Sequence, residues 1–135
     1  MKTLIVEDDF TCRLLLQEIL KSYGPAHVAV NGTEAVRAVK IALEEGNPYD
    51  LICLDIMMPE MDGQEALVKI REQEKKNGIA IGRGARVLMT TALSDKDNVM
   101  KAFREECDGY LVKPIDRADL LNELSELELI KIESV

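Results

Sequence analysis

Five short apolar segments divide the chain at nearly regular intervals. They are continuous rather than alternating in polarity, which is typical of strands buried on both faces of a parallel sheet. Between them, apolar residues recur with the period of an amphipathic helix. The pattern therefore predicts an α/β fold, a doubly wound five-stranded parallel sheet with helical crossovers. The five segments are 4–6, 28–30, 51–54, 87–89 and 110–112.

The expected helices carry apolar residues three or four positions apart, and most of them begin with a capping signature. A capping side chain stands three residues before an acid, so the two can satisfy free backbone N–H groups of the first turn. These capping residues are Asn31, Asp62, Ser94 and Asp116. The apolar sets are Leu15/Ile19, Leu16/Leu20, Ala35/Val39/Leu43, Leu67/Ile70, Val99/Phe103 and Leu120/Leu124/Leu127.

The connection before the fourth strand is longer than the others. Residues 72–86 contain Gly78, Gly82 and Gly84, and we expect a lengthened third helix followed by a surface loop. A surface insertion is favoured over a dedicated binding loop, because connections tolerate extra length. At the other end of the chain, the tail 128–135 is expected to extend the last helix.

Composition favours one domain. The chain has 135 residues, 47% of them hydrophobic, and residues 1–135 are expected to form a single domain with no output domain. Its net charge of −8 argues against nucleic acid and anionic membranes as partners. No apolar run reaches the roughly 18 residues of a membrane span, so we expect a cytoplasmic protein. Cys12, Cys53 and Cys107 lack a CxxC pair and are expected to be reduced thiols, with Cys53 in the core.

Polar residues follow four of the expected strands. Glu7 and Asp8 come after the first strand, Asp55 after the third, Thr91 after the fourth and Lys113 after the fifth. In a doubly wound sheet, the carboxyl ends of the strands form the ligand site. Converging carboxylates repel one another, and Mg²⁺ with its oxygen ligands would relieve that repulsion. Lys113 and Thr91 would orient a phosphoryl group, which a carboxylate accepts as an acyl phosphate.

Each of these residues also has a structural explanation when taken singly. An acidic run favours a helix N-terminus, an aspartate suits a turn, and threonine is common in strands. Their common position at one sheet edge favours a joint site. His27, at the start of the second strand, is expected to be structural. The side chains of Met57, Met58 and Met61 are expected to be packing groups rather than a metal or partner site.

Four segments resemble the receiver domain of two-component response regulators, over nearly the whole chain. That family implies the flavodoxin-like (βα)5 fold with strand order 2-1-3-4-5. The segments are Ile5-Val6-Glu7-Asp8-Asp9, Leu54-Asp55-Ile56-Met57-Met58-Pro59-Glu60-Met61-Asp62-Gly63, Thr90-Thr91-Ala92 and Tyr110-Leu111-Val112-Lys113-Pro114.

The resemblance implies that Asp55 accepts a phosphoryl group from a phosphohistidine, on a sensor histidine kinase or a histidine phosphotransfer protein. It implies Asp8, Asp55 and the backbone carbonyl of Met57 as Mg²⁺ ligands, with Glu7 acting through water. Three acids stand where the family needs two. Counting from the end of the first strand leaves Asp9 as the helix cap.

The resemblance also assigns a phosphate-binding lysine and a switch pair. Lys113 matches the lysine, and its bond to Pro114 is expected to be cis. Thr91 and Tyr110 match the switch: the hydroxyl turns toward the phosphoryl group while the ring rotates inward, changing the affinity for a protein target. The domain would promote only its own phosphorylation and dephosphorylation, and would not be an enzyme that turns over a substrate.

Alternatives remain open from the sequence alone. The domain could be a phosphorelay shuttle, a regulator that docks on a target, or a phosphate sink. A haloacid-dehalogenase-like phosphatase uses Asp-x-Asp after its first strand, and Glu7-x-Asp9-x-Thr11 only approaches that motif. A receiver-like module that never uses phosphate is a third class. Because Met57 and Leu93 are apolar and cannot hold an attacking water, we expect slow self-dephosphorylation.

Overall fold

The computed structural model describes residues 1–58, 60–92 and 107–131. Three expectations fall on residues outside these ranges: the helix cap at Ser94, the apolar pair Val99/Phe103 and the role of Leu93 in the phosphoryl lifetime. All five expected strands and four of the five expected helices lie within the described part of the chain and can be compared with it.

The strands form one parallel sheet in the order β2-β1-β3-β4-β5, which confirms the predicted fold. β1 lies between β2 and β3 and pairs with both, so that Ile5 is opposite Val28 on one side and Cys53 on the other. Each strand extends the predicted apolar segment or shifts it by one or two residues. Their bounds are β1 Thr3–Val6, β2 Ala26–Ala29, β3 Leu51–Asp55, β4 Arg86–Thr91 and β5 Gly109–Val112.

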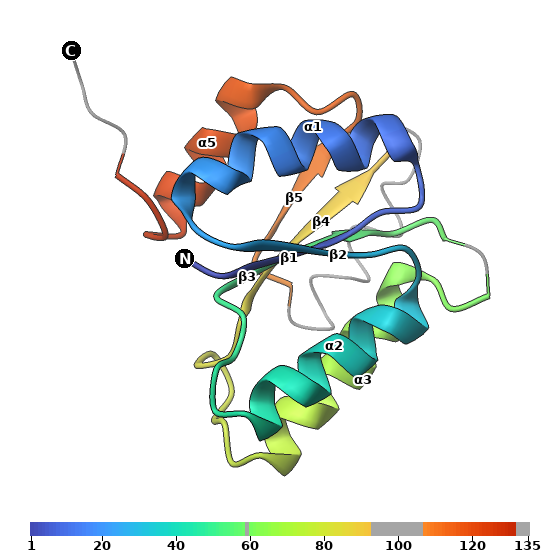
Figure 1. Cartoon of the computed structure of the whole chain (residues 1–135), viewed down its shortest axis with the longest axis vertical. Coiled ribbons are helices and arrows are strands. Elements are labelled where there is room, and N and C mark those ends of the chain that lie inside the picture. Colours follow the sequence, from blue (N-terminus) through green and yellow to red (C-terminus); the bar gives the residue numbers. More distant parts are fainter. Residues whose placement is uncertain (59, 93–106, 132–135) are drawn as a thin grey trace.

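Helices cover both faces of the sheet (Figure 1). The helices are α1 Phe10–Leu20, with the short 3₁₀ turn η1 Lys21–Tyr23 after it, α2 Gly32–Glu44, α3 Gly63–Lys76 and α5 Arg117–Glu126. Because strand side chains alternate between faces, Leu4 and Val6 pack with α2 and α3, whereas Ile5 packs with α1 and α5. The sheet is therefore buried from both sides, as its continuous apolar strands predict.

The helix caps explain why the helices begin where they do. The side chains of Asp9, Asn31 and Asp62 each accept a hydrogen bond from the backbone N–H three residues later, which confirms all three as caps. Asp116 also caps its helix, but it accepts from the N–H of Ala118, two residues later. Asp9 and Asn31 stand shortly after β1 and β2, and Asp62 ends the segment between β3 and α3. These caps therefore fix where the chain turns from each strand into the next helix.

α1 contains both predicted apolar pairs, Leu15/Ile19 and Leu16/Leu20. Leu15 is nevertheless 40% exposed, because the buried face of α1 follows Leu16, Ile19 and Leu20. One expectation about the helices is wrong. The tail was expected to extend α5. Instead the helix ends at Glu126, and Glu128 has a φ of 61°, a left-handed conformation that stops the helical hydrogen bonding.

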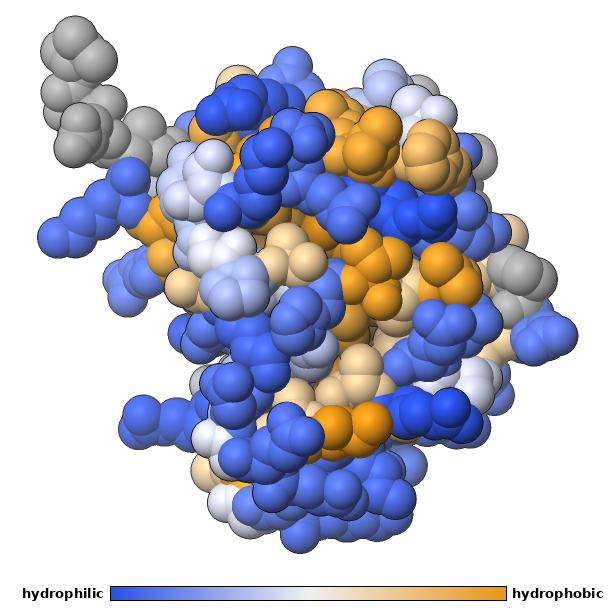
Figure 2. Space-filling view, viewed as in Figure 1, coloured by the Kyte–Doolittle hydropathy of each residue, from blue (hydrophilic) through white to orange (hydrophobic). Residues whose placement is uncertain are grey.

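His27 has a structural contact, as expected. Its Nδ1 lies 2.8 Å from the Tyr49 hydroxyl, and the two rings meet edge to face. This pair lies near the amino end of the edge strand β2, at the opposite end of the sheet from the predicted site residues. Figure 2 shows apolar surface over α1 and near β2. Phe10 and Leu14 on α1 and Val30 just after β2 are exposed apolar residues.

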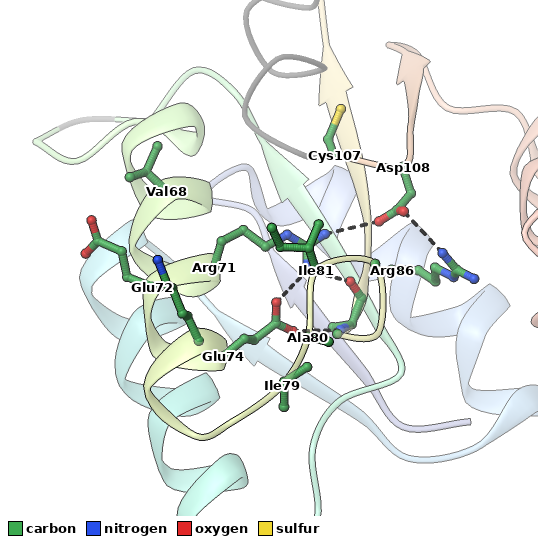
Figure 3. A pocket seen from close by; sticks show the side chains of 14 residues that line it. Val68, Arg71, Glu72, Glu74, Ile79, Ala80, Ile81, Arg86, Cys107 and Asp108 are labelled. Carbon is green, nitrogen blue, oxygen red and sulfur yellow. Dashed lines mark hydrogen bonds and ion pairs between the residues drawn. The ribbon is translucent and has the colours of Figure 1, made fainter.

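The long connection forms a lengthened α3 and a loop over residues 77–85, as predicted. The sequence did not predict what holds this loop. Arg71 on α3 donates to Glu74 at 2.7 Å, to the Ala85 carbonyl at 2.8 Å and to Asp108 at 3.2 Å (Figure 3). Glu74 in turn accepts from the Ala85 N–H at 2.7 Å. A pocket of about 590 Å³ lies between α3 and the loop.

Asp108 joins this cluster to the sheet. Its carboxylate accepts from the Val87 N–H at 2.7 Å and lies 3.4 Å from Arg86, and its own N–H donates to the Val87 carbonyl at 2.8 Å. Asp108 directly precedes β5, so these bonds fix where β5 begins against β4. We call Arg71, Glu74, Arg86 and Asp108 the charged clamp.

We expect Arg71→Ala to lower the free energy of unfolding by about 3 kcal/mol, because it leaves the buried Glu74 carboxylate without its cation. Lys21→Ala is the matched control. It breaks a pair with Glu18 in which both side chains are about 60% exposed, and should cost about 0.5 kcal/mol or less. Urea unfolding followed by circular dichroism measures both, and equal losses would contradict a structural role for the charged clamp.

Candidate functional site

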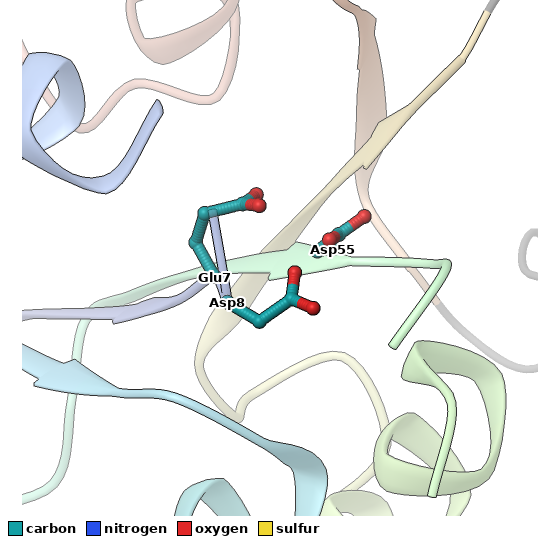
Figure 4. Close-up of side chains that lie close together, drawn as sticks. All are labelled: Glu7, Asp8 and Asp55. Carbon is teal, nitrogen blue, oxygen red and sulfur yellow. The ribbon is translucent and has the colours of Figure 1, made fainter. Parts of the chain in front are cut away.

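Three acidic side chains meet at the carboxyl edge of the sheet (Figure 4). Glu7 and Asp8 follow β1 and Asp55 ends β3, and the central position of β1 beside β3 brings them together. Carboxylate oxygens from all three lie within 4.8 Å of one another. Glu7 is fully buried and Asp55 is 3% exposed, whereas Asp8 faces solvent. The geometry allows all three to ligate one cation.

Lys113 reaches this acidic cluster from the end of β5. Its Nζ donates to Glu7 Oε1 at 3.1 Å and lies 3.3 Å from Asp55 Oδ2. It also lies 3.0 Å from Glu7 Oε2, as an ion pair whose angles do not make a hydrogen bond. Glu7 Oε2 is thus a buried carboxylate oxygen without a hydrogen-bond partner in the described part of the chain. The expected bond between Lys113 and Pro114 is cis, as predicted.

The backbone around Glu7 is held from several directions. Its N–H donates to the Ala29 carbonyl at 3.1 Å, which extends the β1–β2 pairing past the strand ends. Its carbonyl accepts from Arg13 at 3.1 Å, and its Oε1 accepts from the Asp9 N–H at 3.2 Å. The turn from β1 into α1 therefore fixes the carboxylate that Lys113 contacts.

Charge and burial oppose ionisation of Asp55. Burial raises its pKa, the neighbouring Glu7 carboxylate raises it further, and Lys113 only partly offsets them, so the pKa stands at about 7. For Lys113, burial alone would lower the pKa, but Glu7 and Asp55 outweigh it and the net shift is upward. Three carboxylates with one ammonium leave the cluster net negative. A divalent cation fits this donor set.

Magnesium is the ion that these ligands suit best. Glu7 Oε2, which accepts no hydrogen bond among the described residues, and the exposed Asp8 carboxylate offer oxygen atoms, and Mg²⁺ binds through one or two carboxylates while keeping several waters. Metals that prefer sulfur or imidazole ligands are disfavoured, because the cluster found among the described residues consists of carboxylates alone. Cys12 lies close by, but burial and then Glu7 raise its pKa to about 11, so its thiol stays protonated.

The two predicted switch residues lie on adjacent strands, and they differ in exposure. Thr91 at the end of β4 is buried, and its hydroxyl donates to the Ala92 carbonyl at 3.1 Å. Tyr110 on β5 is opposite Met89 in the parallel register and is 42% exposed. Lys113 is tied to Thr91 through its N–H, which donates to the Thr91 carbonyl at 2.7 Å. The structure thus places both switch candidates on adjacent strands.

The expectation that all three methionines are packing groups is wrong for Met57. Its side chain is 60% exposed beside Asp55, whereas Met58 is buried and Met61 packs against the core. The cause is local: the Met57 N–H donates to Asp55 Oδ1 at 3.2 Å in a turn that directs the side chain outward. Leu93, the second residue of the lifetime argument, lies outside the described residues.

Two contacts at the site were missed by the sequence analysis. Arg13 binds the Glu7 carbonyl, and Cys12 lies against the Glu7 side chain. Both are on the first turn of α1, and their spacing from Glu7 is visible in the sequence. The residue types alone do not distinguish Arg13 and Cys12 from other residues of an amphipathic helix. An arginine at such a position is expected to face solvent.

Comparison with known proteins assigns the family. The response regulator receiver domain model matches residues 3–125, and the chain belongs to this family. It is 34% identical over 127 residues to the chemotaxis protein CheY of Halobacterium salinarum, covering 93% of this chain and 95% of that protein. It is 37% identical over 120 residues to hybrid signal transduction histidine kinase L of Dictyostelium discoideum, covering 88% of this chain but only 7% of the kinase.

Solved structures agree with the fold. The receiver domain of the histidine kinase CKI1 from Arabidopsis thaliana, complexed with Mg²⁺ and BeF₃⁻, has a TM-score of 0.81 and 29% identity, with 94% and 89% of the two chains covered. The receiver domain in the complex of the Saccharomyces cerevisiae phosphotransfer protein Ypd1 with Ssk1 gives 0.78 and 29%, with 93% and 87% covered. Among the described residues, no helix has the length and apolarity to cross a membrane.

We expect Asp55→Asn to raise the unfolding temperature in EDTA, because it removes a buried negative charge beside Glu7. A gain of 1 kcal/mol would shift a domain of this size by roughly 3 °C. Addition of Mg²⁺ should raise the unfolding temperature of the wild type but not of the variant. Differential scanning fluorimetry with and without Mg²⁺ measures both effects. The acidic cluster is not a cation site if Mg²⁺ stabilises neither protein.

Proposed function

We propose that this domain is the phosphoacceptor switch of a two-component or phosphorelay system, with Asp55 as the phosphorylated residue. The observation that carries the proposal is the arrangement of Asp55 at the carboxyl edge of the sheet, between the Glu7 and Asp8 carboxylates and the Lys113 ammonium. Membership of the receiver family supports it. Asp55 is a buried carboxyl group that accepts a hydrogen bond from the Met57 N–H and lies beside the Lys113 ammonium, an arrangement that suits phosphoryl transfer once the group is ionised.

In the proposed reaction a carboxylate oxygen of Asp55 attacks the phosphorus of a phosphohistidine. The new P–O bond forms while the P–N bond breaks, and the electron pair of that bond returns to the imidazole nitrogen. Lys113 contributes one positive charge, and the Met57 N–H orients the carboxylate. Asp8, Asp55 and the Met57 carbonyl would hold Mg²⁺, with Glu7 acting through water. The ion would neutralise charge on the phosphoryl oxygens and favour ionised Asp55.

The proposed readout follows from the added charge. Phosphorylation gives Asp55 roughly two negative charges and three acceptor oxygens. Thr91, at the end of the adjacent strand, would turn its hydroxyl toward them, and Tyr110 would move inward from its partly exposed position. The change would shift a pre-existing equilibrium on the β4–β5 side of the domain and alter affinity for a protein target.

The partners and the extent of the domain are part of the same proposal. A histidine kinase or a histidine phosphotransfer protein would donate the phosphoryl group, which the similarity to the Ssk1 receiver domain seen with Ypd1 supports. Residues 1–135 would act as a cytoplasmic receiver domain, and the match to CheY of Halobacterium salinarum over 93% of this chain supports the receiver assignment. The domain would not turn over a separate substrate. Shuttle, effector and phosphate sink all fit this chemistry.

Incubation with acetyl phosphate and Mg²⁺, followed by intact mass measurement, tests the phosphoacceptor. We expect one phosphoryl group on the wild type and none on Asp55→Asn. Lys113→Ala should slow the reaction by about a hundredfold, the effect of losing one group that stabilises developing charge. Lys21→Ala, an exposed lysine variant, should react like the wild type. Phosphorylation of Asp55→Asn, or none of a Mg²⁺-bound wild type, would contradict the proposal.

The exposed Met57 side chain leads to a prediction about lifetime. An apolar group beside Asp55 cannot orient an attacking water, so Met57→Asn should shorten the half-life of the phosphorylated protein severalfold. Ile81→Asn is the control, because Ile81 is another exposed apolar residue, on the loop after α3. The half-life is measured by intact mass after removal of acetyl phosphate. An unchanged half-life in Met57→Asn would disprove the water-exclusion argument.

A further inference from the structure

The segment between Asp55 and α3 is held by two glycines that start two different helices. Gly63 is the first residue of α3 and Gly32 is the first residue of α2. The segment, described here for residues 56–58 and 60–62, carries the Met57 carbonyl that the proposed function assigns to the metal. Its position decides where that carbonyl and the Asp55 carboxylate lie relative to Glu7.

Gly63 packs directly on the peptide that follows Asp55. Its N–H donates to the Ile56 carbonyl at 2.9 Å, so the two ends of the segment are joined. A Cβ at Gly63 would overlap the Asp55 carbonyl oxygen and would lie 2.9 Å from the Ile56 Cα. These are backbone atoms, so no side-chain rotation can relieve the overlap. An alanine would therefore force α3 and the end of β3 apart.

Gly32 touches the same segment from α2. A Cβ there would lie 2.8 Å from the Met61 carbonyl oxygen and 2.9 Å from the Met61 Cγ. Between the two glycine contacts, Glu60 has a φ of 66°, a left-handed conformation that non-glycine residues rarely adopt. Such a conformation persists only where the surrounding structure determines it. The segment is thus held at both ends in a conformation that it would not adopt freely.

We propose that Gly63 and Gly32 are positioning residues for cation binding and phosphoryl transfer, an inference that rests on the proposed function. Neither residue touches a reacting atom. Gly63 acts through the Asp55 and Ile56 backbone, and Gly32 acts through Met61. Ligands must be held within about 0.5 Å of their productive positions. The overlap of a Gly63 Cβ with the Asp55 carbonyl oxygen requires a larger backbone shift than that, whereas the overlap at Gly32 requires a smaller one. The inference assigns a functional requirement to two residues that carry no chemical group.

The test compares three alanine variants of the full chain. Gly63→Ala and Gly32→Ala change the two contacts. Gly84→Ala is the control: a Cβ there would overlap the Glu74 carboxylate in the charged clamp, at the opposite end of the sheet. Each variant is measured for its unfolding temperature in EDTA and for its Mg²⁺ dissociation constant by titration calorimetry. Helix propensity alone would favour alanine over glycine at positions 63 and 32, so a loss of stability there reports the overlap.

We expect Gly63→Ala to weaken Mg²⁺ binding about tenfold to a hundredfold, as changes behind metal ligands do. Gly32→Ala should have a smaller effect, because its overlap is smaller. Gly84→Ala should lose stability and keep the wild-type Mg²⁺ affinity. At saturating Mg²⁺, phosphorylation of Gly63→Ala by acetyl phosphate should be about a hundredfold slower, the cost of a displacement near 1 Å.

The inference is overturned if folded Gly63→Ala binds Mg²⁺ within twofold of the wild type, or if Gly84→Ala loses as much affinity as Gly63→Ala. If Gly63→Ala does not fold, Gly32→Ala decides by the same Mg²⁺ comparison. A wild type that binds Mg²⁺ but takes no phosphoryl group refutes the proposed function alone, since the affinities still compare the glycines. A wild type that binds no Mg²⁺ refutes both.

Discussion

The rest of the site depends on the burial of two like charges beside each other. Glu7 and Asp55 are nearly inaccessible to solvent, and two charges 4 Å apart repel by about 4 kcal/mol at an effective dielectric constant of 20. A fold tolerates this only if a cation is near. Lys113 provides one ammonium between the two carboxylates, but Asp8 adds a third acid at the surface. The arrangement is stable enough to fold and remains short of positive charge.

The position of Lys113 depends on β5, and β5 is short. It has four residues and pairs only with β4, so its register rests on few hydrogen bonds. Before the amino end of β5, Asp108 makes two hydrogen bonds to the Val87 backbone, one through its carboxylate and one through its N–H. Arg71 and Arg86 form ion pairs with the same carboxylate. Just past the carboxyl end of β5, the Lys113 N–H binds the Thr91 carbonyl. The charged clamp therefore lies at the amino end of β5, and the acidic cluster lies at its carboxyl end.

The features of the fold that depend on local sequence pattern could be predicted from the sequence. Continuous apolar segments gave the strands, and polar residues just past them gave the common edge, because parallel strands end on the same side. Asn31 and Asp62 were recognisable as caps by the acid three residues later, and Asp9 followed from counting past the end of the first strand. The strand order and the roles of the individual site residues needed the resemblance to receiver domains.

What the sequence could not give depends on distant contacts or on a single dihedral angle. Arg71 and Asp108 are 37 positions apart, and nothing in their neighbours marks them as a pair. Met57 has an apolar side chain, yet the turn that begins at Asp55 directs it outward. The end of α5 follows from the left-handed conformation of Glu128, a residue type that ordinarily continues a helix.

The shortage of positive charge also explains how a chemical event at Asp55 can reach β5. Lys113 divides its contacts between Glu7 and Asp55, so its preferred position depends on the charge that each of them carries. A phosphoryl group on Asp55 would add charge on one side only and draw the ammonium toward it. Because Lys113 directly follows β5, which carries the partly exposed Tyr110, that movement acts on a strand held by few bonds. Under the proposed function, the electrostatic frustration of the acidic cluster couples phosphorylation to the surface.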